Sequence, residues 1–336
     1  MKLDVIAAVE ACYRLAGDDS TSLAGVLETL GGIGLGPGVV ARVKDAGSGG
    51  GFRTLASAAV GTNAPGWLAQ LEAAQAAAPA KALAALYWPW PPVRRASEVA
   101  ARIGSEAVAM LHTALRTVGL DDGYGVLAGG PEGRLLDVGI GIVGEARLAP
   151  RIRHGLALLS AHLTSALRLR AGLTTPVPLP EDPATEAVLA PGGAVRHAVG
   201  PATSRQARES LSHAVRRMER ARGRLRRTSP EEAIDIWKGL VDGRWSLLDH
   251  HEASGRRLVL VRRNDPRLPD PRALTPGERD ILAYAALGHS SKYVAYLLGL
   301  APSTVASHLA RACRKLGVRD RREAVGLLWP GLVQGP

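Results

Sequence analysis

The spacing of apolar residues predicts four short helices over residues 274–328. Apolar positions recur there at intervals of three and four residues, as on the buried side of a helix. The first helix opens with Thr275-Pro276-Gly277-Glu278, a capping box with proline at the first helical position. The third begins at Pro302 and ends at Gly317, and Asp320 caps the fourth. The three-residue break between the second and third helices, 299–301, predicts a helix-turn-helix.

The third of these helices has one apolar side and one polar side. Val305, Leu309 and Leu316 mark the side expected to be buried. The outward side consists of small, hydroxylated and basic residues, flanked by two more polar side chains: Ser303, Ala306, Ser307, Ala310, Arg311 and Arg314, with Thr304 and His308. Hydroxyls and N–H groups at a helix N-terminus suit phosphate oxygens, and the basic residues add charge. This pattern suits a helix that binds DNA. The alternative is a small helical bundle that binds another protein.

Residues 1–172 read as a mixed α/β module. Helical spacing covers residues 5–15, 22–30, 69–86, 99–118 and 150–170, and strand-like runs cover 38–43, 54–60, 123–128 and 135–142. The last two strands flank the turn 129–133, which predicts a hairpin. The Gly-rich segments 31–38 and 47–51 are interpreted as turns, since neither follows a strand and opens a helix as a phosphate-binding loop does. This order of elements resembles a GAF or PAS sensor in pattern only.

A proline-rich linker, 176–183, precedes a second module over residues 184–264. Two strands at 186–189 and 194–199, helices at 204–225 and 230–241, and a hairpin of 244–250 with 256–261 loosely resemble a PAS-like unit. The helix 204–225 has near-heptad apolar spacing and many arginines. It could be a dimer seam, a second DNA-facing surface or a solvated helix over the sheet. A second linker, 265–271, leads to the C-terminal domain, 272–336.

Charge is concentrated in two segments of the chain. The net charge is +11, with 46% hydrophobic and 22% charged residues, as in an ordinary globular protein. Residues 274–336 hold eight Lys or Arg against four Asp or Glu, and residues 208–227 hold eight Arg against two Glu. A localised basic footprint predicts a polyanionic partner.

Several classes of protein are not expected from this composition. The two cysteines, Cys12 and Cys313, are too few for a disulfide framework and lack metal-ligand spacing, so Cys313 is interpreted as a core thiol. No signal sequence or apolar run long enough to cross a membrane is found, which predicts a cytoplasmic protein. Residues 1–270 show no paired catalytic groups, so we expect neither an enzyme nor a cofactor, and no metal site.

Aromatic residues make up only 4% of the chain, yet they cluster in the segment 87–92. Tyr87, Trp88 and Trp90 would suit a pocket for a small apolar ligand. The alternative is a buried anchor beside a stiff proline turn. His112, His154 and His162 have no spacing for metal binding or catalysis and are interpreted as structural or surface residues.

The C-terminal segment resembles the LuxR/FixJ-type DNA-binding domain. The matching positions include Leu274-Thr275, Glu278-Arg279, Gly288, Ser290, Lys292, Val294-Ala295, Leu298-Gly299-Leu300, Ser303-Thr304-Val305, His308, Lys315-Leu316-Gly317-Val318, Arg321 and Ala324. The resemblance implies a four-helix domain that is dimeric on DNA and reads bases with its third helix. It places Lys292, Thr304, His308 and Lys315 near phosphates, and Ala306, Ser307 and Ala310 at base edges.

The segment departs from the family at three positions. The family commonly has Ser where this chain has Ala301, which removes a cap worth about 1 kcal/mol. It often has basic or polar residues where this chain has Ala306 and Ala310, and alanine there can contact only thymine methyls. Direct base readout is therefore expected to be thin.

The sequence as a whole predicts a multidomain α+β protein, in which two sensor-like α/β modules precede an all-α helix-turn-helix domain. The expected function is transcriptional regulation of the LuxR type, with double-stranded DNA as partner and a small molecule or partner protein at the N-terminal modules. The alternative is a docking protein whose helix-turn-helix no longer reads DNA specifically. A homodimer is expected, paired through the helix with Leu156, Leu159, Leu163 and Leu167 or through the Leu211–Leu225 helix.

Overall fold

The computed structural model describes residues 4–33, 36–46, 52–77, 92–103, 109, 113–129, 134–171, 180–237, 240–241, 245–263, 274–275, 277–278, 281–282, 285, 290–298 and 300–328. The aromatic cluster of Tyr87, Trp88 and Trp90 lies outside these residues, as do His112 and the whole glycine turn 47–51. Within the described residues, no helix is long and apolar enough to cross a membrane.

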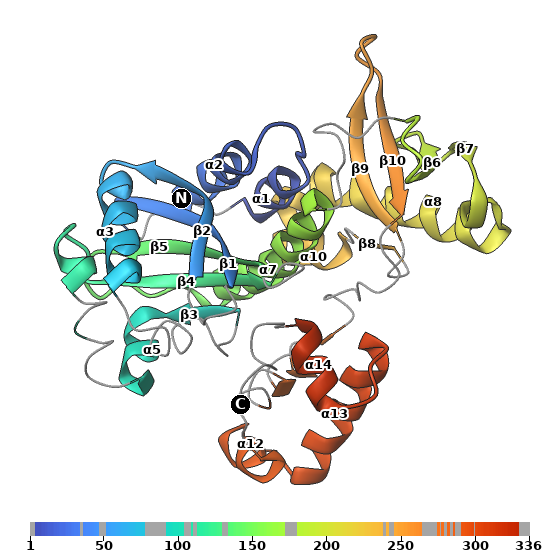
Figure 1. Cartoon of the computed structure of the whole chain (residues 1–336). Helices are drawn as coiled ribbons and strands as arrows, with labels where there is room; N and C mark the ends of the chain where they lie inside the picture. The colour runs from blue at the N-terminus through green and yellow to red at the C-terminus, as the bar shows by residue number, and fades with distance from the viewer. Residues whose placement is uncertain are drawn as a thin grey trace.

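The first module is a five-stranded antiparallel sheet with helices on both faces (Figure 1). Its strands are β1 Gly38–Ala46, β2 Phe52–Gly61, β3 Val93–Arg95, β4 Asp122–Gly129 and β5 Arg134–Ile142, in the order β2-β1-β5-β4-β3. Its helices are α1 Val5–Cys12, α2 Asp19–Leu30, α3 Ala64–Ala77, α5 Ala96–Ile103 and α7 Pro150–Ala171. Asp4 and Asp18 cap α1 and α2 by accepting backbone N–H groups.

Successive side chains of the central strands point to opposite faces of the sheet, and the two faces contact different helices. Val39, Ala41 and Val43 of β1 pack into the core shared with α1, α2 and α7. Val40 faces the opposite way and packs against Trp67 of α3. Gly139 of β5 is also on that face, where a Cβ would come within 2.8 Å of the Trp67 ring, so the helix can lie close to the sheet.

The second module repeats this strand order on a smaller scale. Its strands are β6 Thr185–Leu189, β7 Val195–Ala198, β8 Leu240–Val241, β9 Trp245–His251 and β10 Arg257–Arg263, in the order β7-β6-β10-β9-β8. Numbered within each module, both sheets run second, first, fifth, fourth, third. The helices are α8 Arg205–Arg220, α9 Arg226–Thr228 and α10 Pro230–Ile236, with the π-helical turn η4 Ala221–Leu225 between α8 and α9.

The structure differs from the sequence predictions at several places in these modules. The helix expected over 230–241 ends at Ile236, and Leu240–Val241 is strand β8. Strand β3 was not expected, and the helix expected to start at residue 99 starts at Ala96. The helix expected over 204–225 changes to π geometry at Ala221, where Gly223 has a non-helical ψ of -135°. Ser229 makes no side-chain capping bond to α10.

One continuous apolar core joins the two modules. It contains Leu156, Leu159, Leu163 and Leu167 of α7 together with Leu211, Val215 and Met218 of α8 and much of both sheets. The near-heptad residues of α8 are therefore packed within the chain. The same holds for the leucines of α7, so neither helix offers the apolar dimer seam predicted from the sequence.

The C-terminal domain has its own small cores. Its helices include α12 Ser291–Leu298, α13 Pro302–Leu316 and α14 Arg321–Leu328, and residues 277, 278, 281, 282 and 285 before them are helical. One cluster joins Leu274 and Leu282 to Ala312, Leu316 and Ala324, and a second joins Ile281, Val294 and Ala295 to Val305. These contacts hold α13 against the helices on either side of it.

Candidate nucleic-acid interface

Helix α13 is the centre of the candidate interface, and its ends follow from local chemistry. Pro302 occupies the first turn, and Ala301 provides no side-chain cap, as the sequence indicated. Gly317 ends the helix in the left-handed region, with φ 67°, and its N–H donates to the Arg314 and Cys313 carbonyls. Asp320 then accepts the Glu323 N–H and opens α14, as predicted.

The two sides of α13 differ as expected. Val305, Ala312, Cys313 and Leu316 are buried. The opposite side is exposed and consists of Ser303, Ala306, Ser307, Ala310, Arg311 and Arg314. Thr304 and His308 are half-buried at its margin, and Lys292 is exposed on α12. The structure therefore presents the predicted polar residues of α13 together on one surface.

Glu278 fixes the orientation of α13 from beneath. Its Oε2 accepts the Thr275 backbone N–H at 2.8 Å, and its own N–H donates to Thr275 Oγ1 at 3.3 Å, which confirms the capping box. The same Oε2 binds Lys315 Nζ at 2.8 Å. Burial raises the pKa of the Glu278 carboxyl, but Lys315 and Thr275 outweigh it and hold the pKa below its ordinary value.

Lys315 thus has a partner that the sequence analysis did not identify. The resemblance placed this residue near phosphate, whereas its ammonium is bound to a carboxylate that is 2% exposed. Arg311 lies farther away, with Nε 3.9 Å from Glu278 Oε1 and half of its side chain exposed. Arg311, Arg314 and Lys292 have more freedom to meet a ligand than Lys315 has.

His308 lies between α13 and the start of the domain. Its Cε1 is 3.9 Å from the position that a Cβ on Gly277 would take. Its Nδ1 is buried, with no hydrogen-bond partner among the described residues. The ring thus packs beside the first helix, and only its outer edge can reach a phosphate.

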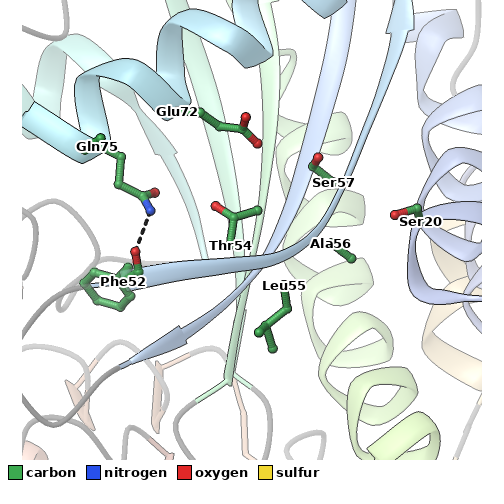
Figure 2. A pocket seen from close by; sticks show the side chains of 9 residues that line it. Ser20, Phe52, Thr54, Leu55, Ala56, Ser57, Glu72 and Gln75 are labelled. Carbon is green, nitrogen blue, oxygen red and sulfur yellow. Dashed lines mark hydrogen bonds between the residues drawn. The ribbon is translucent and has the colours of Figure 1, made fainter.

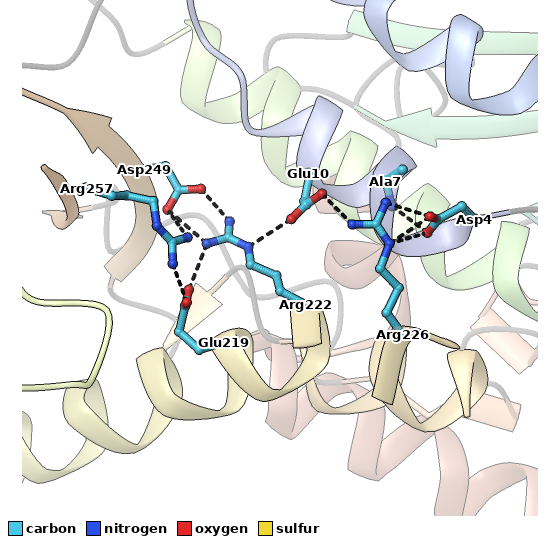
Figure 3. A network of polar contacts seen from close by, with 8 residues as sticks. All are labelled: Asp4, Ala7, Glu10, Glu219, Arg222, Arg226, Asp249 and Arg257. Atoms are coloured by element: carbon cyan, nitrogen blue, oxygen red, sulfur yellow. Dashed lines mark hydrogen bonds and ion pairs between the residues drawn. The ribbon is translucent and has the colours of Figure 1, made fainter. Parts of the chain in front are cut away.

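The basic segment 208–227 is largely neutralised on one side, which sequence reasoning missed. Arg222 Nε lies 3.0 Å from Glu10 Oε1, and Nη1 lies 2.9 Å from Glu219 Oε1 and 3.0 Å from Asp249 Oδ1 (Figure 3). Burial lowers the pKa of Arg222, but these carboxylates outweigh it and raise the pKa. Arg226 pairs with Asp4 at 2.6 Å and with Glu10 at 3.2 Å. These arginines join the two modules.

A second charge cluster lies inside the first module, on the α3 face of the sheet. Asp137 pairs with Arg42 at 2.8 Å, Lys44 at 3.8 Å and Arg94 at 4.0 Å, and all four residues are buried. Burial and the neighbouring Arg42 hold the pKa of Lys44 well below its ordinary value. Burial raises the pKa of Asp137, but the three cations outweigh it and lower the pKa. The sequence contains a signal for this cluster. Along β1, charged residues at 42 and 44 alternate with apolar residues at 39, 41 and 43, so they lie on the opposite face of the sheet.

A surface pocket of the described residues lies apart in sequence from the aromatic segment 87–92. It has a volume of about 570 Å³ along the β2 edge, and its lining is mostly polar: Ser20, Phe52, Thr54, Leu55, Ala56, Ser57, Glu72, Gln75 and Ala76 (Figure 2). Gln75 Nε2 donates to the Phe52 carbonyl at 2.7 Å across one end of it.

The other candidate residues have structural surroundings. His162 is buried, and its Nδ1 lies 3.0 Å from the Tyr13 hydroxyl. Both cysteines are buried, as predicted for Cys313, and burial raises their pKa. In the described part of the chain, no group of His, Cys, Asp and Glu could hold a metal ion.

Residues 272–328 match the family of bacterial regulatory proteins, luxR family. The transcriptional activator protein EchR of Dickeya chrysanthemi is 30% identical over 83 residues, which cover 24% of this chain and 33% of that protein. The transcriptional activator protein BjaR1 of Bradyrhizobium diazoefficiens is 41% identical over 54 residues, 16% of this chain and 22% of that protein. The matched region is therefore at most about a third of these relatives.

Among solved structures, Escherichia coli SdiA aligns with 96% of this chain and 95% of its own, at 12% identity and a TM-score of 0.35. SdiA in complex with octanoyl-rac-glycerol aligns at 11% identity and a TM-score of 0.29. The sequence match identifies residues 272–328 as a luxR-family domain, which confirms the resemblance drawn from the C-terminal residues.

Proposed function

We propose that this luxR-family domain makes the chain a DNA-binding transcriptional regulator, with α13 in the major groove. The observation that carries the proposal is the exposed side of α13, where hydroxyl and guanidinium groups stand opposite a fully packed apolar side. The matched segments of two transcriptional activators support it.

We assign the interface in two groups. Lys292, Ser303, Thr304, Arg311 and Arg314 are proposed to contact phosphates, with the outer edge of His308 beside them. Ala306, Ser307 and Ala310 are proposed to face base edges. Lys315 is proposed to act mainly through Glu278, because that carboxylate holds its ammonium. Since two of the three base-facing residues are alanines, sequence preference is expected to be modest.

We also propose that two copies pair on DNA. A thin reading face gains specificity when two half-sites are bound about one helical turn apart. Sedimentation of the full chain with and without a twofold-symmetric duplex tests this. A complex holding one chain per duplex at saturation would contradict pairing.

The N-terminal modules are proposed to be GAF- or PAS-like sensors that bind a small molecule or a partner protein. Their support is the strand order that both sheets share, with helices packed on the sheet. A DNA-binding regulator works where the DNA is, so we propose the cytoplasm as its location.

The decisive experiment is selection of duplexes from a random library by the purified full chain, followed by salt titration of the selected site. Arg311→Ala should weaken binding to all duplexes alike and reduce the salt slope by roughly one unit. Arg147→Ala, an exposed arginine of the first module with no ion pair among the described residues, is the control. Duplex binding without sequence preference, beside capture of one protein partner, would favour the docking alternative.

A further inference from the structure

The helical segment α8–η4–α9 divides its arginines between two sides. Arg222 and Arg226 turn inward to carboxylates of α1, α8 and β9 (Figure 3). Arg220 pairs with Glu232 of α10 at 3.1 Å. The remaining arginines of residues 208–227 have no carboxylate within ion-pair distance among the described residues: Arg208, Arg216, Arg217, Arg224 and Arg227. The structure thus leaves five uncompensated positive charges on one helical segment.

These five arginines lie on the outside of the second module. Four of them are exposed and Arg217 is half-buried. Arg216 donates to the Ser212 hydroxyl at 2.9 Å and to the Ser212 carbonyl at 3.3 Å, both neutral acceptors of its own helix. The other four make no side-chain hydrogen bond among the described residues. No contact of the described fold requires a cation at these positions.

The side of the helix beneath this arginine face is packed against the core. Ala207, Leu211, Ala214, Val215 and Met218 bury the opposite side of α8 in the core that both modules share. Arg222 and Arg226 anchor the following turns to α1. The positive charges of these arginines repel one another, and binding of a polyanion relieves that repulsion. Because the helix is already formed, binding does not have to order it first.

The spacing fits a phosphate backbone. From Arg208 to Arg217 the regular helix α8 rises about 14 Å at 1.5 Å per residue, and Arg224 and Arg227 follow beyond the π-helical turn. The α8 part alone matches about four successive phosphates on one DNA strand, at about 3.4 Å of rise each. One guanidinium group can donate two parallel hydrogen bonds to a phosphate, and it is less strongly hydrated than an ammonium group.

The chain also limits how far this face can be from the helix-turn-helix. Ten residues, 264–273, connect β10 to Leu274. A chain of that length spans at most about 35 Å, roughly one turn of a DNA duplex. Once the C-terminal domain is bound, the second module is therefore held at high effective concentration beside the flanking DNA.

We propose that the arginine face of α8–η4–α9, formed by Arg208, Arg216, Arg217, Arg224 and Arg227, binds the backbone of the DNA flanking the site that the C-terminal domain occupies. The contact is independent of sequence and steep in its dependence on salt. It rests on the proposed function, because it needs a duplex that the helix-turn-helix has already placed. An anionic membrane surface is the other partner that such a face would suit.

The test uses the full chain and the triple variant Arg216→Gln, Arg224→Gln, Arg227→Gln. The matched control, Arg116→Gln, Arg147→Gln, Arg196→Gln, removes three exposed arginines that have no ion pair among the described residues and lie on other elements. Two duplexes are titrated with salt: the selected site alone, and the site extended by about ten base pairs on each side, one further helical turn. Melting temperatures verify that all three proteins are folded.

On the extended duplex, the triple variant should lower the salt slope by roughly two to three units, at about 0.9 per phosphate contact. A fourfold rise in salt should then cost the wild-type chain roughly 40-fold more affinity than the variant. On the short duplex, variant and wild type should differ little, and the order of preferred sequences should not change. The control should keep the wild-type slope on both duplexes.

Three results would overturn the inference. The first is a triple variant with the wild-type slope on the extended duplex. The second is a control that loses as much slope, since net charge alone would then explain the effect. The third is a triple variant that loses binding to phosphatidylserine vesicles but binds duplexes as the wild-type chain does. That result would assign the arginine face to membranes. If the wild-type chain binds no duplex at any salt, the proposed function fails as well, and this result differs from all three.

Discussion

The ion pair between Glu278 and Lys315 allows a sharp test of how the recognition helix is held. In Lys315→Met the side chain keeps most of its length but loses its ammonium, so the Glu278 carboxylate, 2% exposed, keeps the Thr275 N–H and the more distant Arg311 guanidinium at 3.9 Å. Removing one partner of a fully buried ion pair costs about 3–5 kcal/mol. The Lys315 side chain is 36% exposed, and water replaces part of the interaction. We therefore expect a loss of about 1–2 kcal/mol.

The complementary change is Glu278→Gln, in which the amide oxygen can still accept the Thr275 N–H. It leaves Lys315 charged and solvated, so it should cost about 1 kcal/mol or less. It also removes a negative charge beneath α13 and releases the ammonium. Its salt slope on a duplex should therefore rise above wild type, by up to about one unit.

Hydrogen exchange in the full chain measures the first effect, read on peptides from α13, and salt titration of a duplex measures the second. A loss of 1–2 kcal/mol appears as exchange roughly 5- to 30-fold faster in Lys315→Met. Its salt slope should change by less than about half a unit. Wild-type exchange together with a slope reduced by a full unit would refute the bracing role and restore Lys315 as a phosphate contact.

The pH dependence of the pair has a definite sign. The pKa of Glu278 is held below its ordinary value, so the carboxylate stabilises the domain above the unfolded pKa of about 4.3. That contribution is lost as the pH falls through the lower folded pKa. The difference in exchange between wild type and Glu278→Gln should therefore shrink as the pH is lowered below about 4.

Other parts of the chain give further tests. Thr304→Ala should weaken duplex binding and leave exchange in α13 nearly unchanged, whereas Val305→Ala should destabilise the domain by roughly 1–3 kcal/mol through lost buried methyl groups; equal destabilisation by both would overturn the orientation of α13. Asp137→Asn removes the buried carboxylate that Arg42, Lys44 and Arg94 share, and it should lower the stability of the N-terminal modules by about 3 kcal/mol or more in chemical denaturation. A wild-type unfolding midpoint would contradict the buried cluster. Because the folded pKa of Asp137 is also lowered, its contribution should disappear as the pH falls below the unfolded value of about 3.9.

Local signals explain why much of the fold could be predicted. The hairpins β4–β5 and β9–β10 were located because alternating apolar runs flank glycine-containing turns. The start of the C-terminal domain and the end of α13 followed from Thr275, Glu278 and Gly317, whose capping roles depend on residues within three or four positions. These features need no information from distant parts of the chain.

The strands that were missed depend on distant partners. Val93–Arg95 becomes β3 by pairing with residues 124–126, and Leu240–Val241 becomes β8 by pairing with Trp245 and Ser246. Three and two residues are too few to show alternation. The inward turn of Arg222 and Arg226 was equally hidden, because Asp4 and Glu10 lie more than two hundred positions earlier in the sequence.

The apolar stripes on α7 and α8 show the main limit of reading a site from sequence. A stripe at three- and four-residue spacing says that one side of a helix is buried, but not whether the covering surface belongs to the same chain. Here the covering surface is the core that joins the modules. The large apolar side chains that stay exposed in the described residues, Leu55, Val143, Val199 and Leu300, lie on four separate parts of the fold. Partners that meet these described surfaces are therefore expected to be recognised mainly through charge and hydrogen bonds.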